Sequence, residues 1–253
     1  MLIEVLGAYG GESPGCRMTC LRINGAIALD AGSLTQALPI DEQVAIHSIV
    51  LTHSHMDHTA SLPFFTENVF GKIHRAIEVY TSAATAYAMR RHLFNNDTWP
   101  DFTRLPNHLL PAVRFHELED GVPVTLDGVT FTPIAVTHTV PTFGFLIEHG
   151  GRAVVWSSDT GPTQRLWEVA NRTPGLAAVC IETSFDNGYQ RIADLSLHLT
   201  PQALERELTK LEKKVPVLIH HLKPVCAERI REEVRALGHP DVEFLEQGRV
   251  YEF

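Results

Sequence analysis

Short apolar runs alternate with turn signals along the whole chain, and this pattern is the first structural signal in the sequence. The runs are rich in Val, Ile, Leu and Phe, and Gly, Pro, Asn, Asp or Ser bound them. Runs of this kind predict β-strands. The predicted strands cover residues 2–7, 18–23, 26–29, 48–52, 78–81, 122–126, 129–136, 143–148, 153–157, 177–181 and 217–220.

Helices are predicted between these strands, and two of them are the clearest. Residues 201–213 follow Thr200, a natural N-cap, begin with Pro201, and carry leucines at helical spacing on one face. Residues 227–237 form a second predicted helix that ends before Gly238. Strand pairs in both halves of the chain, each followed by helices, predict an α/β fold of two sheets packed face to face with helices outside.

The composition fits one folded domain that lies away from membranes. The 253 residues are 44% hydrophobic and contain no repeat or long linker, so we expect a single domain over residues 1–253. No apolar run reaches the about 20 residues that a membrane helix needs. The first residues read directly as a strand and not as a secretion signal. We therefore expect a cytoplasmic protein with reduced cysteines and no membrane partner.

The net charge of −9 with neutral histidines limits the partners we expect. A surface of this sign repels polyanions, which disfavours a large nucleic-acid partner. A small anionic substrate stays compatible with the charge, because bound cations can reverse the local potential. A homodimer is compatible with this sequence.

The strongest chemical signal is the sequence HSHMDH at residues 53–58, directly after an apolar strand. Side chains two residues apart on an extended segment point the same way, so His53 and His55 can bind one metal. If a helix begins near Thr59, Asp57 and His58 turn towards a second metal. A solvated His-rich loop is the plainer alternative, but it gives no reason for this pattern behind a buried strand.

Three further residues of ligand type follow apolar strands: His138, Asp159 and His221. The carboxyl ends of strands in layered α/β folds form one rim, so residues remote in sequence converge there. A single His after a strand is more often structural than a ligand, but the joint occurrence of three such residues favours ligands.

These residues together resemble the metallo-β-lactamase superfamily, whose HxHxDH loop, later His, Asp and final His bind two metals. Further motifs resemble class II cyclic-nucleotide phosphodiesterases: DTGP at 159–162, IETSF at 181–185, HLTP at 198–201, HHLKP at 220–224, HLFN at 92–95 and WP at 99–100. The resemblance implies an αββα sandwich. It also implies that Asp159 bridges both metals and that His221, not His220, is the last ligand.

The ligand set predicts two divalent ions and a hydrolytic reaction. Two close cations lower the pKa of a bridging water enough to supply hydroxide near neutral pH, and Asp57 can orient this nucleophile. Zinc suits a His-rich site with some carboxylate, whereas Mn²⁺ and Fe²⁺ tolerate similar ligands.

His198 is the predicted proton donor to the leaving oxygen, with Glu182 as the residue that orients it. This expectation rests on the short sequence motifs around both residues, which resemble motifs of tRNA 3′-processing endonucleases. Proton donation contributes about 10²–10⁴-fold to such reactions. A helix-entry role for His198 and a structural ion pair for Glu182 are the alternatives.

An inserted segment at about residues 71–114 is expected to wall the substrate pocket. His92, Asn95 and Trp99 in this segment are candidate substrate contacts, because an aromatic ring can stack on a base and an amide can read its edge. Phe143 and Lys223 are further candidates. Core packing is the more common role for Trp99 and Phe143, as is a surface position for Lys223.

The sequence therefore predicts a binuclear-metal phosphodiesterase that hydrolyses 3′,5′-cyclic nucleotides, cAMP or cGMP, to 5′-monophosphates. RNA 3′-end processing is the alternative, although no basic, glycine-rich arm is recognisable. A thioester hydrolase or lactonase comes third. A non-catalytic binding module is disfavoured, because all seven predicted ligands are present.

Overall fold

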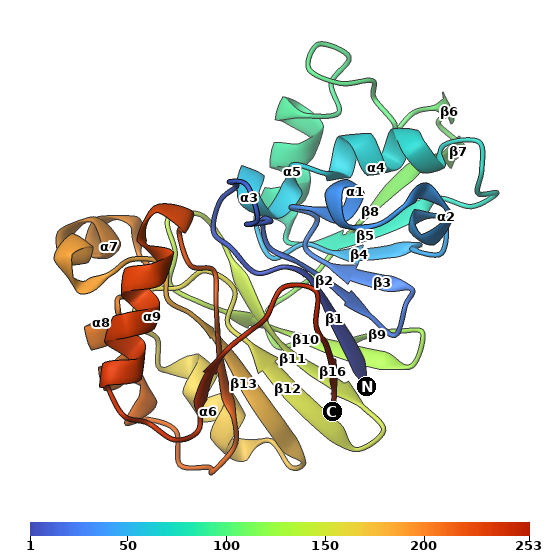
Figure 1. Cartoon of the computed structure of the whole chain (residues 1–253). Helices are drawn as coiled ribbons and strands as arrows, with labels where there is room; N and C mark the ends of the chain where they lie inside the picture. The colour runs from blue at the N-terminus through green and yellow to red at the C-terminus, as the bar shows by residue number, and fades with distance from the viewer.

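The strands of the protein form two seven-stranded sheets, as the computed structural model of residues 1–253 shows (Figure 1). The first sheet has the order β16-β1-β2-β3-β4-β5-β8. Its strands are β1 (Leu2–Gly7), β2 (Cys20–Ile23), β3 (Ile27–Leu29), β4 (Ser48–Val50), β5 (Ile77–Thr81), β8 (Val113–Glu117) and β16 (Val250–Glu252).

The second sheet has the order β15-β14-β13-β12-β11-β10-β9. Its strands are β9 (Val124–Leu126), β10 (Val129–Ala135), β11 (Phe143–His149), β12 (Arg152–Trp156), β13 (Leu176–Glu182), β14 (Val217–His220) and β15 (Val242–Phe244). Strands β12 to β15 run parallel, and so do β3, β4, β5 and β8. A separate short pair joins β6 (Pro106–Asn107) and β7 (Leu110–Pro111).

Helices cover the outer faces of both sheets. Those between β3 and β8 are α1 (Leu34–Ala37), α2 (Ile40–Gln43), α3 (Met56–Thr59), α4 (Leu62–Val69) and α5 (Ala83–His92). Those in the second half are α6 (Arg165–Arg172), α7 (Gln190–Ser196), α8 (Pro201–Leu208) and α9 (Ala227–Ala236), with the 3-10 turns η1 (Asn187–Tyr189) and η2 (Pro224–Cys226).

Alternation of side chains along each strand produces three apolar layers. On β12, Val154 and Trp156 pack between the two sheets, whereas Val155 packs against the helices outside. The cluster between the sheets includes Leu21 and Phe131, one from each sheet. A second cluster joins the first sheet to α1, α4 and α5, and a third joins the second sheet to α6, α8 and α9. The predicted αββα sandwich is therefore confirmed.

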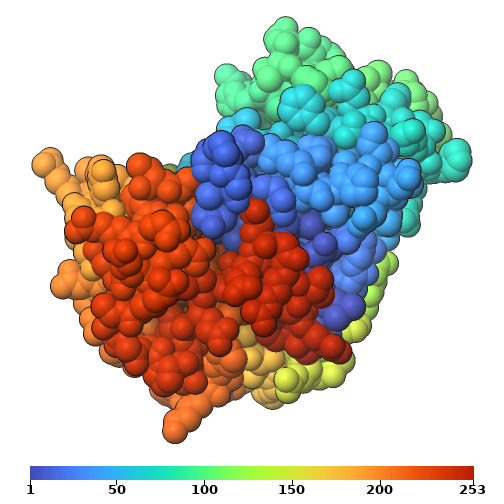
Figure 2. All heavy atoms as spheres, in the orientation of Figure 1, coloured from blue at the N-terminus to red at the C-terminus, as the bar shows by residue number.

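The two ends of the chain meet in the first sheet. β1 and β16 are antiparallel neighbours, and the N and C labels lie close together in Figure 1. In the space-filling view, blue N-terminal atoms border red C-terminal atoms (Figure 2). The last strand thus completes the sheet that the first strand begins. No helix of the chain has both the length and the apolar character needed to cross a lipid bilayer.

Some boundaries differ from those that the pattern predicts. The helix predicted for residues 201–213 ends at Leu208, because the Asn171 side chain accepts a hydrogen bond from the Glu212 backbone N–H at 2.9 Å and donates one to the Lys210 carbonyl at 2.9 Å. These bonds turn the chain out of the helix. The apolar pattern also failed to indicate β8, β15 and β16.

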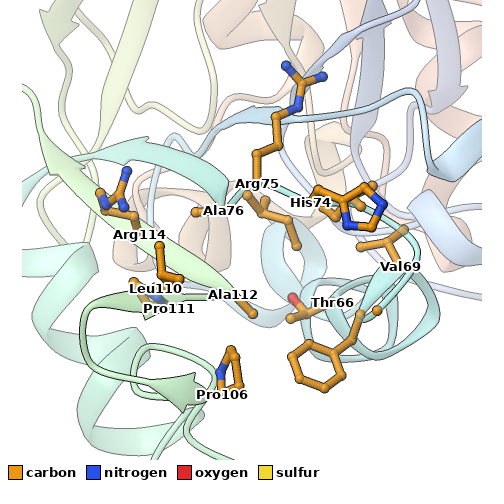
Figure 3. Close-up of a pocket in the computed structure, with 14 residues that line it drawn as sticks. Thr66, Val69, His74, Arg75, Ala76, Pro106, Leu110, Pro111, Ala112 and Arg114 are labelled. Carbon is orange, nitrogen blue, oxygen red and sulfur yellow. The ribbon is translucent and has the colours of Figure 1, made fainter.

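The segment at residues 71–114, expected to be an insertion, belongs partly to the first sheet, because it contains β5 and the start of β8. Its remaining parts are α5 and the loop that carries β6 and β7. Together with α4 it walls a pocket of about 280 Å³ (Figure 3). Thr66, Val69 and Leu110 line this pocket, and no predicted metal ligand does.

Thr200 is the N-cap of α8, as the sequence predicted. Its hydroxyl accepts a hydrogen bond from the Ala203 backbone N–H at 3.3 Å and donates one to the Gln190 side chain at 2.6 Å. We expect Thr200→Ala to lower the free energy of unfolding by about 1 kcal/mol, because the Ala203 N–H in the first helical turn loses the hydroxyl that accepts its hydrogen bond. Chemical denaturation measures this change. The exposed Thr209→Ala is the control, and equal stabilities of the two variants would contradict the capping role.

Candidate metal centre

Seven predicted ligands converge in two groups that share one carboxylate. The first group is His53, His55, His138 and Asp159, and the second is Asp57, His58, Asp159 and His221. Within each group the candidate ligand atoms all lie within 4.8 Å of one another.

In the first group, nitrogens of two histidines lie near one oxygen of Asp159, and the third histidine faces one of them. His53 Nε2 lies 3.6 Å and His138 Nε2 lies 3.8 Å from Asp159 Oδ2. The ring nitrogens His138 Nε2 and His55 Nδ1 face each other at 3.3 Å. Nitrogens that face each other in this way are typical of ligands of a common cation.

In the second group, the other oxygen of Asp159 takes the corresponding place. Asp159 Oδ1 lies 3.2 Å from His58 Nε2 and 3.1 Å from His221 Nε2. His221 Nε2 is also 3.4 Å from Asp57 Oδ2, and the two histidine Nε2 atoms are 3.1 Å apart. Each oxygen of Asp159 therefore faces a different group, which is the arrangement of a bridging carboxylate.

The backbone around residue 55 separates the two groups. His55 has extended backbone angles (φ −65°, ψ 151°), and α3 begins at the next residue, Met56. The sequence placed this helix start near Thr59, three residues too late. Asp57 and His58 therefore lie inside the first helical turn, which places their ligand atoms in the second group.

Neighbouring parallel strands bring the later residues together. β12, β13 and β14 lie side by side in register, and Asp159, Glu182 and His221 stand at or just beyond their carboxyl ends. His221 has a left-handed backbone (φ 65°), and its N–H donates to the Ala8 carbonyl at 2.7 Å. Gly10 packs so closely on His221 that a Cβ there would lie 2.5 Å from the ring. The glycine-rich loop at residues 7–11 thus borders the site.

The unsatisfied atoms of this cluster fit a pair of metal ions. His53 Nε2 and Asp159 Oδ1 are buried and have no hydrogen-bond partner. Leaving such groups unpaired is costly unless a cation takes them as ligands. Atoms bound to one tetrahedral ion at about 2.0–2.2 Å lie about 3.3–3.6 Å apart, close to the separations in both groups. The donor set, mostly imidazole with carboxylate, suits zinc.

The protonation states also suit metal binding. Burial lowers the pKa of His53 and His55, and it lowers that of His138 to about 4, so these rings offer lone pairs near neutral pH. Burial opposes ionisation of Asp159, but His221 and His58 more than offset it and hold its pKa well below the usual range. His58 is the exception. Burial disfavours its charge, yet Asp159 and Asp30 raise its pKa, so metal binding there must release a proton.

Asp30 contacts the candidate ligands, and the sequence pattern did not single it out. Its Oδ2 accepts a hydrogen bond from His58 Nδ1 at 2.7 Å, and its Oδ1 accepts from the backbone N–H and the hydroxyl of Thr52 at 2.8 and 3.0 Å. The Thr52 hydroxyl lies 3.0 Å from His53 Nδ1. Carboxylates in this position orient the rings of metal-binding histidines. The signal was present, because Asp30 directly follows the apolar strand β3.

Glu182 and His198 lie together beside the second group. His198 Nδ1 donates to Glu182 Oε1 at 2.6 Å, and both side chains are buried. Burial opposes protonation of His198, but the Glu182 carboxylate more than offsets it and raises the pKa. The ring of His198 lies 5.0 Å from that of His138 and 5.5 Å from that of His221, measured between centroids. The pair therefore lies beside candidate ligands of both groups.

Glu182, His198 and His221 also form a third group of metal-ligand type. The hydroxyl of Ser184 occupies the space among them, 2.8 Å from Glu182 Oε2, 3.1 Å from His198 Nδ1 and 2.9 Å from His221 Nδ1. We therefore interpret this group as a hydrogen-bonded network and not as a third metal site.

The substrate contacts expected in the 71–114 segment do not lie among these residues. His92 is exposed, and Asn95 holds its own loop, since its Oδ1 accepts from the N–H groups of Asp97 and Thr98. Trp99 packs edge to face on Phe64 at 5.1 Å. No contact joins these three candidates to the metal ligands.

The other two substrate candidates lie nearer. Phe143 is half-buried against the core between the sheets, and its N–H donates to the carbonyl of Thr52, the residue before His53. Lys223 Nζ lies 3.1 Å from Asp57 Oδ2 and keeps 25% of its side-chain area exposed. Lys223 is thus a cation at the edge of the second group. His220 stacks on Trp156 at 3.8 Å and joins neither group.

Comparison with known proteins agrees with this architecture. A family model described as a β-lactamase superfamily domain matches residues 26–221, a range that contains every candidate ligand. Curated relatives include proteins named ribonuclease Z. The one from Mycobacterium sp. (strain KMS) is 26% identical, with 89% of this chain and 86% of the relative aligned. The one from Mycolicibacterium gilvum (strain PYR-GCK) is 28% identical, with 76% and 71% aligned.

Solved structures share the fold at low sequence identity. Yeast PDE1 superposes with a TM-score of 0.80 at 16% identity, and 98% of both chains is covered. The metallo-β-lactamase fold protein YhfI from Bacillus subtilis gives a TM-score of 0.79 at 15% identity, with 99% of both chains covered. The short form of human tRNase Z gives 0.70 at 17% identity, covering 100% of this chain and 99% of the other.

Replacement of Asp159 tests the two-group arrangement. Because its two oxygens face different groups, Asp159→Ala should disrupt both and leave little tightly bound metal. Asp57 belongs to the second group alone, so Asp57→Ala should lose about half as much metal as Asp159→Ala. Elemental analysis of the purified proteins after dialysis measures the content. Equal metal loss in the two variants would contradict the bridging position of Asp159.

Proposed function

Because the chain belongs to the β-lactamase superfamily and has a hydrogen-bonded Glu–His pair beside a candidate two-metal site, we propose that it is a metal-dependent phosphodiesterase. The observation that carries the proposal is the buried Glu182–His198 hydrogen bond of 2.6 Å next to His221. Cleavage of a phosphodiester releases an alkoxide, which is a poor leaving group without a proton. His198, which lies beside the candidate metal ligands, can supply this proton.

The side chains have distinct roles in this reaction. The Glu182 carboxylate accepts the Nδ1–H of His198, so Nε2 of a protonated His198 carries the proton for the leaving oxygen. Asp57, whose pKa His221 and His58 hold low despite burial, is an anion that binds metal and accepts a hydrogen bond from an attacking water. Bound divalent ions, for which we propose zinc, supply an activated water and offset charge on the phosphoryl oxygens.

RNA is the first substrate to test. The curated relatives, aligned over most of this chain, are named ribonuclease Z, and the fold superposes on the short form of human tRNase Z. These relatives favour RNA 3′-end processing over hydrolysis of cyclic nucleotides.

A 3′,5′-cyclic nucleotide is the second candidate, and two observations favour it. Yeast PDE1, a cyclic nucleotide phosphodiesterase, superposes over 98% of both chains. The loop that projects from the first sheet, residues 93–112, carries two aspartates and one arginine, and the net charge of the chain is −9. A loop of this composition gains little from RNA phosphates, whose neutralisation drives binding.

A substrate panel separates these candidates. The metal-loaded protein should hydrolyse at least one phosphodiester among a precursor tRNA, cyclic AMP and cyclic GMP, and it should leave a thioester and a lactone intact. Product analysis by chromatography measures each reaction. Hydrolysis of only the thioester or the lactone would contradict the proposed phosphodiesterase.

Replacement of His198 tests the proton donor. We expect His198→Ala to lower kcat by about 10²–10⁴-fold, because the leaving oxygen loses its acid, and to retain the metal content of the wild type. The exposed His239→Ala is the matched control and should keep full turnover. Unchanged kcat in His198→Ala, or loss of metal with the activity, would show that His198 has another role.

A further inference from the structure

The hydroxyl of Ser184 connects a metal-ligand candidate to the carboxylate of the acid–base pair. Its oxygen lies 2.9 Å from His221 Nδ1 and 2.8 Å from Glu182 Oε2, and all three side chains are buried. The other oxygen of Glu182 accepts from His198. The Glu182 carboxylate therefore binds His198 directly and is connected to His221 through the Ser184 hydroxyl.

The single hydroxyl hydrogen decides which atom of His221 carries a proton. Ser184 can donate to Glu182 Oε2 at 2.8 Å, to His221 Nδ1 at 2.9 Å or to the His221 carbonyl at 3.2 Å, and the bond to the charged carboxylate is both the shortest and the strongest. With this hydrogen used, the Ser184 oxygen can only accept from His221 Nδ1–H. The lone pair of His221 then lies on Nε2, the atom that faces Asp57 and Asp159.

The first metal group contains the same arrangement. The Thr52 hydroxyl donates to Asp30 Oδ1 at 3.0 Å and lies 3.0 Å from His53 Nδ1, which leaves Nε2 of His53 without a hydrogen bond. Asp30 also holds His58 directly. In each group, then, one histidine is hydrogen-bonded to a hydroxyl, and that hydroxyl donates its own hydrogen to a buried carboxylate.

We propose that Ser184 is a positioning residue, which fixes the ring and tautomer of His221 for the second metal by passing on a hydrogen bond from Glu182. Glu182 therefore serves both the proton donor and the metal centre. The proposal rests on the proposed metal centre but not on the identity of the substrate.

Metal titration of Ser184→Ala tests the proposal. Removal of the hydroxyl frees the His221 ring, so the second ion should bind about 10–100-fold more weakly while the first ion binds as in the wild type. Thr52→Ala should weaken the first ion instead. The apo proteins are titrated with Zn²⁺ against a chelator, with Asp57→Ala as the reference for a damaged second group. Retained binding of the first ion also shows that Ser184→Ala is folded.

Ser158→Ala is the matched control, because the Ser158 hydroxyl is buried beside Asp159 and has no hydrogen-bond partner. It should bind both ions as the wild type does. Wild-type affinity for both ions in Ser184→Ala would overturn the proposal, as would equal weakening of the two ions.

The two partners of Glu182 provide a second test. Glu182→Gln should weaken the second ion, since its effect reaches His221 through Ser184, whereas His198→Ala should not. Equal affinity for the second ion in the two variants would overturn the proposed connection from Glu182 through Ser184 to His221. Failure of the proposed function is distinguishable, because the wild type would then cleave no phosphodiester even though Ser184→Ala weakens the second ion.

Discussion

The arrangement of the site depends on one buried carboxylate, that of Asp159. It is 1% exposed, its two oxygens face two different sets of histidines, and one of these oxygens has no hydrogen bond. A buried anion in such surroundings needs positive charge on both sides. On the side of the first group, burial lowers the pKa of His53 and His138, so these rings supply no charge near neutral pH. His58, whose pKa is raised, faces only the other oxygen, whereas a pair of cations supplies positive charge on both sides.

The two sheets keep this carboxylate between its partners. Parallel strands β12, β13 and β14 end side by side, which places Asp159, Glu182 and His221 within reach of one another. The opposite sheet supplies the HxHxDH loop after β4. Apolar packing between the sheets holds these two edges together, so the positions of the ligands depend on the core as well as on local sequence.

The sequence predicted the fold and the converging residues because both rest on local patterns. Apolar runs located the central strands, and ligand-type residues at their ends marked the site. Short edge strands such as β15 and β16 lacked a distinctive run, and the end of α8 depends on a remote contact with Asn171. Asp30 and Ser184 were missed for a related reason, since their importance comes from hydrogen bonds across the site. Sequence spacing does not show such bonds. The expected contacts in the 71–114 segment rested on resemblance and on side-chain chemistry, neither of which fixes a position in space, and there the structure has a separate pocket.

The most direct test of the account is anomalous diffraction from a crystal of the protein grown with Zn²⁺. Two peaks about 3.5–4 Å apart, each within bonding distance of a different oxygen of Asp159, are the predicted result. A single peak, or peaks bound away from Asp159, would contradict the shared two-metal centre.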